Sequence, residues 1–223
     1  MGCSTSPKIV IEVFLDYICP YSKKIVKTLK QNNIISSYSE RGVCFTFYQV
    51  PQPWHFQTTF CHAVSLSFQQ LHPEKFDDFF HLLFEHQEEF FDDVIKNKTK
   101  GQILEELGTL AESVGGDKDE VILLSEMDGA AHDGRSIAGE LKFVTKFHRK
   151  RGVHVTPTVF LNGFFDLFVC PLVTFYSLFD NFVVFGDMSR IEADAISSSW
   201  SAEEWREFLD RYVVEDEEDE EKS

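Results

Sequence analysis

Three stretches of the chain carry the apolar patterns of β-strands. Residues 8–15, KIVIEVFL, are rich in β-branched and aromatic residues with no breaker, which is typical of a buried strand. A second strand is predicted at 43–50, VCFTFYQV, and it ends at the two prolines of PQPWH. Residues 152–163, GVHVTPTVFLNG, return to β character and close on Asn-Gly, a strong hairpin signal.

Helical periodicity dominates between these strands. The segment 21–35 follows a proline that suits a first helical turn, and its apolar residues recur at helical spacing. From residue 56 to about 151 the pattern is amphipathic, with one helix at 75–91, one at 99–116 and one or two at 119–151. A serine cap followed by glutamates predicts a last helix within 201–213.

The order of these elements predicts an α/β fold with an all-helical insertion between the second and third strands. We expect a flexible tail at 1–7, the first half of the fold at 8–54 and the insertion at 55–151. The second half is expected at 152–213, and a disordered acidic tail at 214–223, because its EDEEDEE block cannot bury itself.

The charge balance changes the list of partners. The chain has 21 Lys and Arg against 37 Asp and Glu, a net charge of −16. Binding to a nucleic-acid backbone requires the opposite sign, so nucleic acid is not expected as a main partner.

The cysteines and the N-terminus bear on the compartment. Five cysteines without a C-x-x-C pair indicate neither a disulfide framework nor a zinc site, so a reducing compartment fits best. The N-terminus lacks the basic and long apolar regions of a secretory signal. MGCSTS matches the myristoylation pattern at Gly2, with Cys3 placed for palmitoylation. We therefore expect a cytoplasmic location, either with peripheral membrane attachment through two acyl chains or with an unmodified tail.

Cys19, in DYICPYSKK, is the first candidate for chemistry. It directly precedes a predicted helix, where unpaired N–H groups and the helix dipole favour a nucleophilic thiolate, and Lys23 and Lys24 add to that field. The alternative from position alone is a packed, inert cysteine. A second signal is VTPT, in which a cis Thr156–Pro157 bond would expose backbone groups beside a helix start.

CPYS and VTPT together resemble the thioredoxin superfamily. With the helical insertion, GVHVTPTVFLNG and the closing Trp-containing helix, the chain looks like the DsbA-like proteins of that fold. The resemblance implies that Cys19 is the nucleophile. It also implies that Pro20, Tyr21, Thr156 and Pro157 bind an extended substrate.

Ser22 departs from the family pattern, because dithiol members have a second, resolving cysteine at that position. Net dithiol oxidation by this motif alone is excluded. The remaining activity is monothiol exchange through Cys19, as in disulfide isomerisation or deglutathionylation, on protein or glutathione disulfides. Ser22 either steadies the thiolate or is an ordinary first-turn serine. No tightly bound cofactor is implied, and glutathione is the expected co-substrate.

Two other functions stay open. The kappa-class glutathione transferases share this architecture and activate glutathione with a serine near the same helix start, so Ser22 or Cys19 would then lie near the glutathione sulfur. A redox-inactive module that binds peptides between CPYS and VTPT is the third interpretation.

The remaining candidates carry weaker signals. Trp54 and His55 either overhang the groove, with His55 as a proton donor, or serve to anchor the insertion, which is the favoured interpretation. Four histidines lack metal-ligand spacing and are expected to be surface or core residues, so no metal is predicted; they are His62, His72, His81 and His86. Cys44 is expected in the core. The aromatic segment 164–190 is too interrupted for a membrane span, and we interpret it as an insertion or translated intron sequence.

Overall fold

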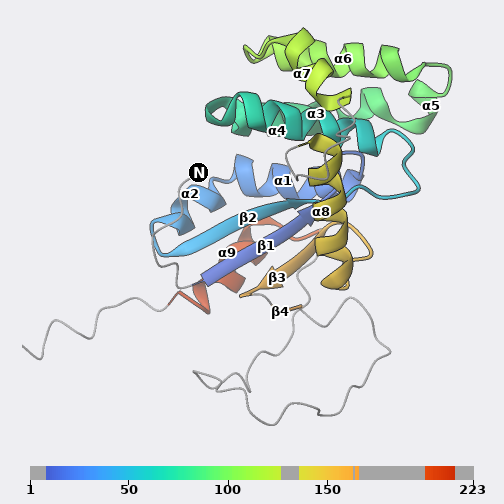
Figure 1. The fold of residues 1–223 in the computed structure, drawn as a ribbon. Coiled ribbons are helices and arrows are strands. Elements are labelled where there is room, and N and C mark those ends of the chain that lie inside the picture. The colour runs from blue at the N-terminus through green and yellow to red at the C-terminus, as the bar shows by residue number, and fades with distance from the viewer. Residues whose placement is uncertain (1–8, 127–135, 163, 166–198, 214–223) are drawn as a thin grey trace, which may run out of the picture.

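The computed structural model describes residues 9–126, 136–162, 164–165 and 199–213. Four strands form one sheet in the order β2-β1-β3-β4 (Figure 1). They are β1 (Ile9–Leu15), β2 (Val43–Gln49), β3 (Thr158–Leu161) and β4 (Phe164–Phe165). β1 pairs in parallel with β2 and antiparallel with β3, and β3 pairs antiparallel with β4. The central position of β1 explains why its sequence is apolar at every position except Glu12.

Helices cover both faces of this sheet. α1 (Pro20–Gln31), α2 (Ile34–Ser39) and α9 (Ala202–Asp210) pack on one face, where Val13 of β1 shares a core with Leu29 and Trp205. α8 (Ile137–Lys150) covers the other face, where Phe147 packs against Phe14 (Figure 1). The α/β class and the helical insertion between the second and third strands are confirmed.

The rest of the helical block lies on the far side of α1 from the sheet (Figure 1). It contains α3 (Thr58–Leu71), α4 (Phe76–Glu85), α5 (Asp92–Ile95), α6 (Lys100–Ser113) and α7 (Lys118–Glu126), with two short 3-10 turns at Pro73–Lys75 and Gln87–Phe90. None of the helices in the described ranges has the length and apolar content that a membrane span requires.

Several local predictions are confirmed by capping and turn geometry. The last helix begins with a capping box between Ser201 and Glu204. β3 and β4 form the predicted hairpin, and Asn162 adopts the left-handed conformation (φ 51°) that this turn requires. The hydrogen bonds of the Asn162 backbone N–H and side chain to Val10 join this turn to β1.

Two predicted helices are interrupted. The segment 21–35 divides at Asn33, whose left-handed conformation (φ 57°) ends α1 and starts α2. The segment 75–91 is helical only to Glu85, and the chain then turns at His86 into the 3-10 turn. This second break places Gln87 next to the loop that carries Cys19, as described below.

One charged residue lies in the central strand. Glu12 is 6% exposed, and its carboxylate accepts two hydrogen bonds from Arg151, at 3.0 and 2.7 Å. The Arg151 guanidinium also lies 4.5 Å from the ring centre of Phe160. A bidentate pair satisfies the buried carboxylate, which would otherwise be costly inside a sheet.

Cys44 lies on β2 and is buried, as expected of a core residue. It is disulfide-bonded, which the number and spacing of the cysteines did not predict. Among the described residues, Cys19 and Cys61 are the free cysteines. Gly2, Cys3, Cys170, the segment 166–190 and the acidic tail lie outside the described residues.

Candidate active site

The two segments that the sequence singled out meet at Cys19. This residue is the N-cap of α1, with extended backbone angles (φ −77°, ψ 119°) and Pro20 in the first turn. Its thiol donates a hydrogen bond to the carbonyl oxygen of Thr156, 3.1 Å away. The Thr156–Pro157 peptide bond is cis, as the sequence predicted. Cys19 and the proline loop, 137 positions apart in the chain, therefore form one candidate site.

Ser22 lies in the first turn of α1 and is fully buried. Its hydroxyl oxygen accepts a hydrogen bond from the backbone N–H of Asp16, 3.2 Å away. This contact ties the start of the helix to the end of β1. Tyr21, directly before Ser22, is 62% exposed, so the first turn of α1 presents Tyr21 to solvent and turns Ser22 inward.

Asp16 is a functional candidate that the sequence analysis missed. It ends the apolar run of β1 and is completely buried. Its carboxylate accepts hydrogen bonds from Ile18 N–H (3.0 Å), Gln52 N–H (3.2 Å) and the Thr58 hydroxyl (2.5 Å). The signal was an acidic residue at the end of a buried strand, three positions before the cysteine.

A buried polar chain leads away from Asp16 into the insertion. The Nε2 atom of His62, on α3, lies 3.5 Å from Asp16 Oδ1. Burial by itself raises the pKa of Asp16, but His62 and the hydrogen bonds outweigh it, so this pKa lies below its usual value. The other ring nitrogen of His62 lies 3.0 Å from the side-chain oxygen of Gln49. Asp16 is thus an ionised group shared by the loop and the insertion.

Gln87 also holds the backbone of the loop that leads from β1 to Cys19. Its side-chain nitrogen donates to the carbonyl oxygens of Tyr17 (2.6 Å) and Cys19 (2.9 Å), and the side chain is 1% exposed. Because Gln87 belongs to the 3-10 turn after α4, the insertion fixes the backbone position of Cys19. No sequence signal marked this residue.

The favoured interpretation of Trp54 is wrong. Its side chain is 57% exposed and so does not anchor the insertion on the sheet. Phe56, two residues on, is 60% exposed, and Val155, directly before Thr156, is 48% exposed. His55 is partly buried, and its Nδ1 atom has no hydrogen-bond partner among the described residues.

The comparisons with known proteins agree with this geometry. A family model for thioredoxin (Thioredoxin_4) matches residues 1–165. The chain belongs to the thioredoxin family. A search of curated proteins gives no match.

Solved structures with the same thioredoxin fold include thiol-disulfide enzymes. A protein from Pseudomonas syringae, named as a candidate protein-disulfide isomerase, has a TM-score of 0.65 at 19% identity, covering 92% of this chain and 94% of its own. Oxidised BdbD from Bacillus subtilis has a TM-score of 0.62 at 19% identity, covering 95% and 90%. MdbA, a thiol-disulfide oxidoreductase from Actinomyces oris, has a TM-score of 0.51 at 20% identity, covering 71% and 72%. At these identities the similarity shows the fold.

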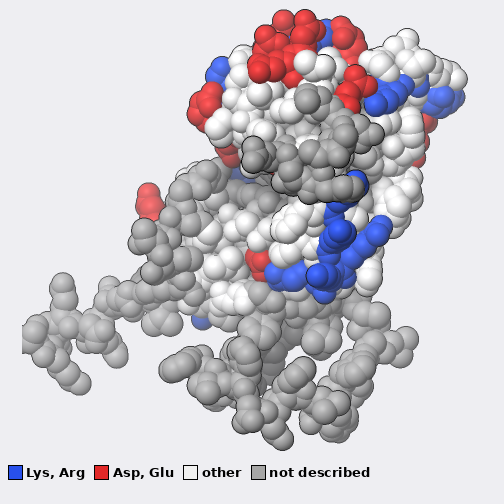
Figure 2. All heavy atoms as spheres, in the orientation of Figure 1, with Lys and Arg blue, Asp and Glu red and all other residues white. Residues whose placement is uncertain are grey.

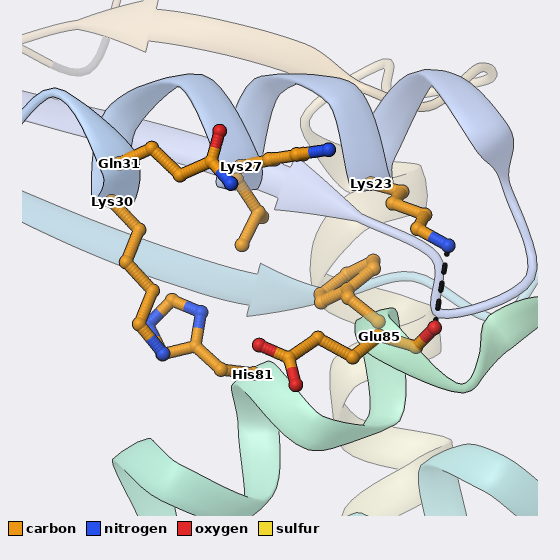
Figure 3. Close-up of a pocket in the computed structure, with 8 residues that line it drawn as sticks. Lys23, Lys27, Lys30, Gln31, His81 and Glu85 are labelled. Carbon is orange, nitrogen blue, oxygen red and sulfur yellow. Dashed lines mark hydrogen bonds between the residues drawn. The ribbon is translucent and has the colours of Figure 1, made fainter.

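Within this thioredoxin fold, a pocket of about 340 Å³ lies between α1 and α4 (Figure 3). Val26 and Phe84 are among its apolar lining, and Lys23, Lys27 and Lys30 contribute cations from one side of α1. Lys23 donates to the carbonyl oxygen of Glu85 and pairs with Glu88 at 3.1 Å. Its charge is therefore partly neutralised, and the field that the sequence analysis assigned to it at Cys19 is weakened.

The four histidines that the sequence analysis considered as metal ligands occupy separate environments. His62 is buried beside Asp16. His81 is buried in the wall of the pocket, where its burial lowers its pKa and the nearby positive charge of Lys30 lowers it further. His72 accepts a weak hydrogen bond from Asp117 N–H at 3.4 Å, and His86 lies 2.6 Å from Glu89. Within the part of the chain that the structure describes, no group of three potential ligands gathers to hold a metal ion.

Proposed function

We propose that this protein catalyses thiol–disulfide exchange with Cys19 as its single nucleophile. The observation that carries the proposal is the free Cys19 thiol, held at the N-terminus of α1 against the Thr156 carbonyl, with a serine in place of a resolving cysteine. A helix N-terminus favours the thiolate, which is the attacking species.

The proposed reaction needs a thiol from outside the CPYS motif, supplied either by the substrate or by glutathione, to resolve the mixed disulfide. The Cys19 thiolate attacks one sulfur of a substrate disulfide, forms a mixed disulfide and releases the other sulfur as a thiolate. A second thiol of the substrate then attacks the mixed disulfide in isomerisation, which leaves the number of disulfides unchanged. In deglutathionylation Cys19 takes up the glutathionyl group, and reduced glutathione releases it as glutathione disulfide.

Exposed apolar side chains support a protein substrate. Tyr21 and Val155 flank the two segments that meet at Cys19, and Trp54 and Phe56 lie in the loop that Gln52 joins to Asp16. Such surface suits apolar segments of an unfolded or partly folded chain. Pro20, Thr156 and Pro157 are proposed to contact the substrate backbone, and His55 is proposed to protonate the leaving thiolate.

The lysine-lined pocket supports an anionic co-substrate such as glutathione. It begins one turn along α1 from Cys19, about 6 Å along the helix axis. Lys27 and Lys30 supply positive charge, and Val26 and Phe84 supply apolar walls. Neutralising Lys27 (K27Q) is expected to raise the KM for glutathione while leaving the rate with dithiothreitol unchanged. An equal change in the kinetics with both reductants would show that glutathione does not bind in this pocket.

We also propose that the protein acts in the cytoplasm and that Gly2 and Cys3 are acylated. The support is the N-terminal sequence MGCSTS. Intact-mass analysis of the protein from its native cells tests both modifications, with Gly2→Ala as the control. An unmodified glycine would contradict the myristoyl assignment.

The decisive experiment follows glutathione release from a glutathionylated peptide by the full-length protein. Cys19→Ala is expected to reduce turnover to background, whereas Cys61→Ala is expected to retain it. Quenching with acid should trap glutathione on Cys19 alone, detected by mass spectrometry. Ser22→Cys should lower the amount of this trapped species, because the thiol introduced by the substitution competes for the mixed disulfide.

Other outcomes distinguish the alternatives. Conjugation of glutathione to an electrophile that persists in Cys19→Ala and is lost in Ser22→Ala would indicate a glutathione transferase. Peptide binding without turnover or a trapped adduct would indicate a binding module.

A further inference from the structure

A basic face runs along α8, on the opposite side of the sheet from α1. Lys142, Lys146, Arg149 and Lys150 are all exposed, at helix positions i, i+4, i+7 and i+8. This spacing places them on one side of the helix over about 12 Å. Figure 2 shows Lys and Arg side chains gathered over α8 as a continuous patch on this view of the molecule. We call these four residues the α8 basic face.

These four charges are not neutralised within the part of the chain that the structure describes. None of the four makes an ion pair with another residue that the structure describes. Arg151, directly after them, instead donates two hydrogen bonds to Glu12 in the sheet. The opposite side of α8 is the one that packs on the body, through Ile137 and Phe147. Four adjacent like charges with no ion-pair partner among the described residues are unfavourable unless an anion balances them.

Phe143 adds an apolar element beside the basic face. It lies one position after Lys142 and is 69% exposed, the most exposed of the large apolar side chains described. Its ring is stacked on Phe147 at 6.3 Å, so it is supported from the core side. An exposed aromatic ring next to lysines is the combination that inserts at a membrane interface while the cations meet anionic head groups.

The charge of the whole molecule restricts the partner. At −16 the chain is repelled at long range by any anionic surface, so only a local patch can make contact within a Debye length of about 8 Å. Three of the four cations are lysines, which act as point charges toward diffuse head-group charge, whereas bidentate phosphate recognition favours arginine. A single convex helix face also provides no groove for a nucleic-acid backbone.

We propose that the α8 basic face, with Phe143, docks the protein on a membrane surface rich in anionic lipid. The face is distinct from the Cys19 site, and the proposal does not depend on the thiol chemistry. It gives the N-terminal acylation pattern a physical role, because one acyl chain binds a membrane only marginally and a polybasic patch is a sufficient second signal.

The test uses unacylated full-length protein and sedimentation with vesicles of equimolar phosphatidylserine and phosphatidylcholine, compared with pure phosphatidylcholine. Binding is expected only to the anionic vesicles and is expected to weaken as salt increases. The triple variant K142Q/K146Q/K150Q should lose about 100-fold in affinity, since each lysine at such a surface contributes about fivefold. Phe143→Ser should weaken binding at every salt concentration.

The matched control is K24Q/K27Q/K96Q, which removes the same charge from exposed lysines elsewhere. This control is expected to bind the anionic vesicles as the unmodified chain does. Equal losses in the two triple variants would overturn the proposal, because net charge alone would then explain binding. Equal binding to both vesicle types would also overturn it. Binding of a single-stranded oligonucleotide through the α8 lysines, without binding to the vesicles, would overturn it as well.

Discussion

Cys19 and Cys61 are the two free thiols among the described residues, with 7% and 1% of their surfaces exposed. Cys61 lies within α3, where burial, followed by the negative charge of Asp16, raises the pKa of its thiol far above the usual range. Cys19 lies at the start of α1, where the backbone has unpaired N–H groups, and its thiol contacts the Thr156 carbonyl. We therefore expect two similarly buried thiols to differ in reactivity, because the backbone around each sulfur differs.

The largest expected difference between the two thiols is in alkylation. Cys61 is enclosed by the core, so iodoacetamide reaches it only when the structure opens globally, which costs at least about 5 kcal/mol. Cys19 is also buried, but it lies at the start of α1 and its thiol contacts the Thr156 loop, so a local movement of that loop is sufficient to expose it. We expect Cys19 to react at least about 1,000-fold faster, measured by peptide mapping after timed labelling at neutral pH.

Labelling in denaturant is the control for this experiment. The two thiols should then react at similar rates, because their surroundings are lost. Comparable rates in the folded protein would contradict the comparison and would show that α3 opens locally.

Asp16→Asn is expected to have the next largest effect, because it breaks the buried contact with His62 while keeping the size of the side chain. A loss of about 3 kcal/mol in the free energy of unfolding is expected at neutral pH. Since the pKa of Asp16 in the folded protein lies below 3.8, the carboxylate contributes its full stability above that pH. This contribution disappears as the pH falls through the folded-state value.

Urea unfolding of both proteins across this acidic range measures the effect. The two unfolding curves should converge at the lowest pH values and separate as the pH rises. A difference in stability that stays constant with pH would show that the charge of Asp16 is not the source of its contribution.

Gln87→Ala should have a smaller effect on stability and a specific effect on Cys19. It removes two hydrogen bonds to the carbonyl oxygens of Tyr17 and Cys19, which is expected to cost about 2 kcal/mol. The loop then moves more freely, so alkylation of Cys19 should accelerate while Cys61 stays protected. Parallel acceleration at both thiols would mean that the variant destabilises the whole fold and does not act on the loop.

These residues show where sequence reasoning succeeds. The run KIVIEVFL, the proline after Cys19 and the pair Asn162-Gly163 each carry a local signal, so the central strand, the helix start and the hairpin were predictable. The meeting of Cys19 and Thr156 followed from the family resemblance. Ser22 as a catalytic residue stays a prediction, because its one described hydrogen bond is to the backbone of Asp16.

Tertiary contacts account for what was missed. The role of Gln87 depends on a helix that ends at Glu85, and the amphipathic pattern of 75–91 continues without interruption through that point. Asp16 and His62 are 46 positions apart, and only the packing of α3 on the loop brings them together. Trp54 was expected to anchor the insertion on the sheet, because it lies where the insertion begins, whereas its side chain is 57% exposed after β2.

The smallest expected effect is that of Cys61→Ala, and it is the most informative about coupling between the two thiols. Removing one buried sulfur from α3 should cost only about 1 kcal/mol. Asp16 lies close enough to Cys61 to raise the pKa of its thiol, and its backbone N–H also donates to Ser22 beside the Cys19 loop. If the Asp16 carboxylate is held mainly by Gln52, Thr58 and His62, the loop should be insensitive to this change. The alkylation rate of Cys19 should then vary by less than about twofold. A larger change would mean that Cys61 belongs to the active site through Asp16, and its thiol would no longer be an inert core group.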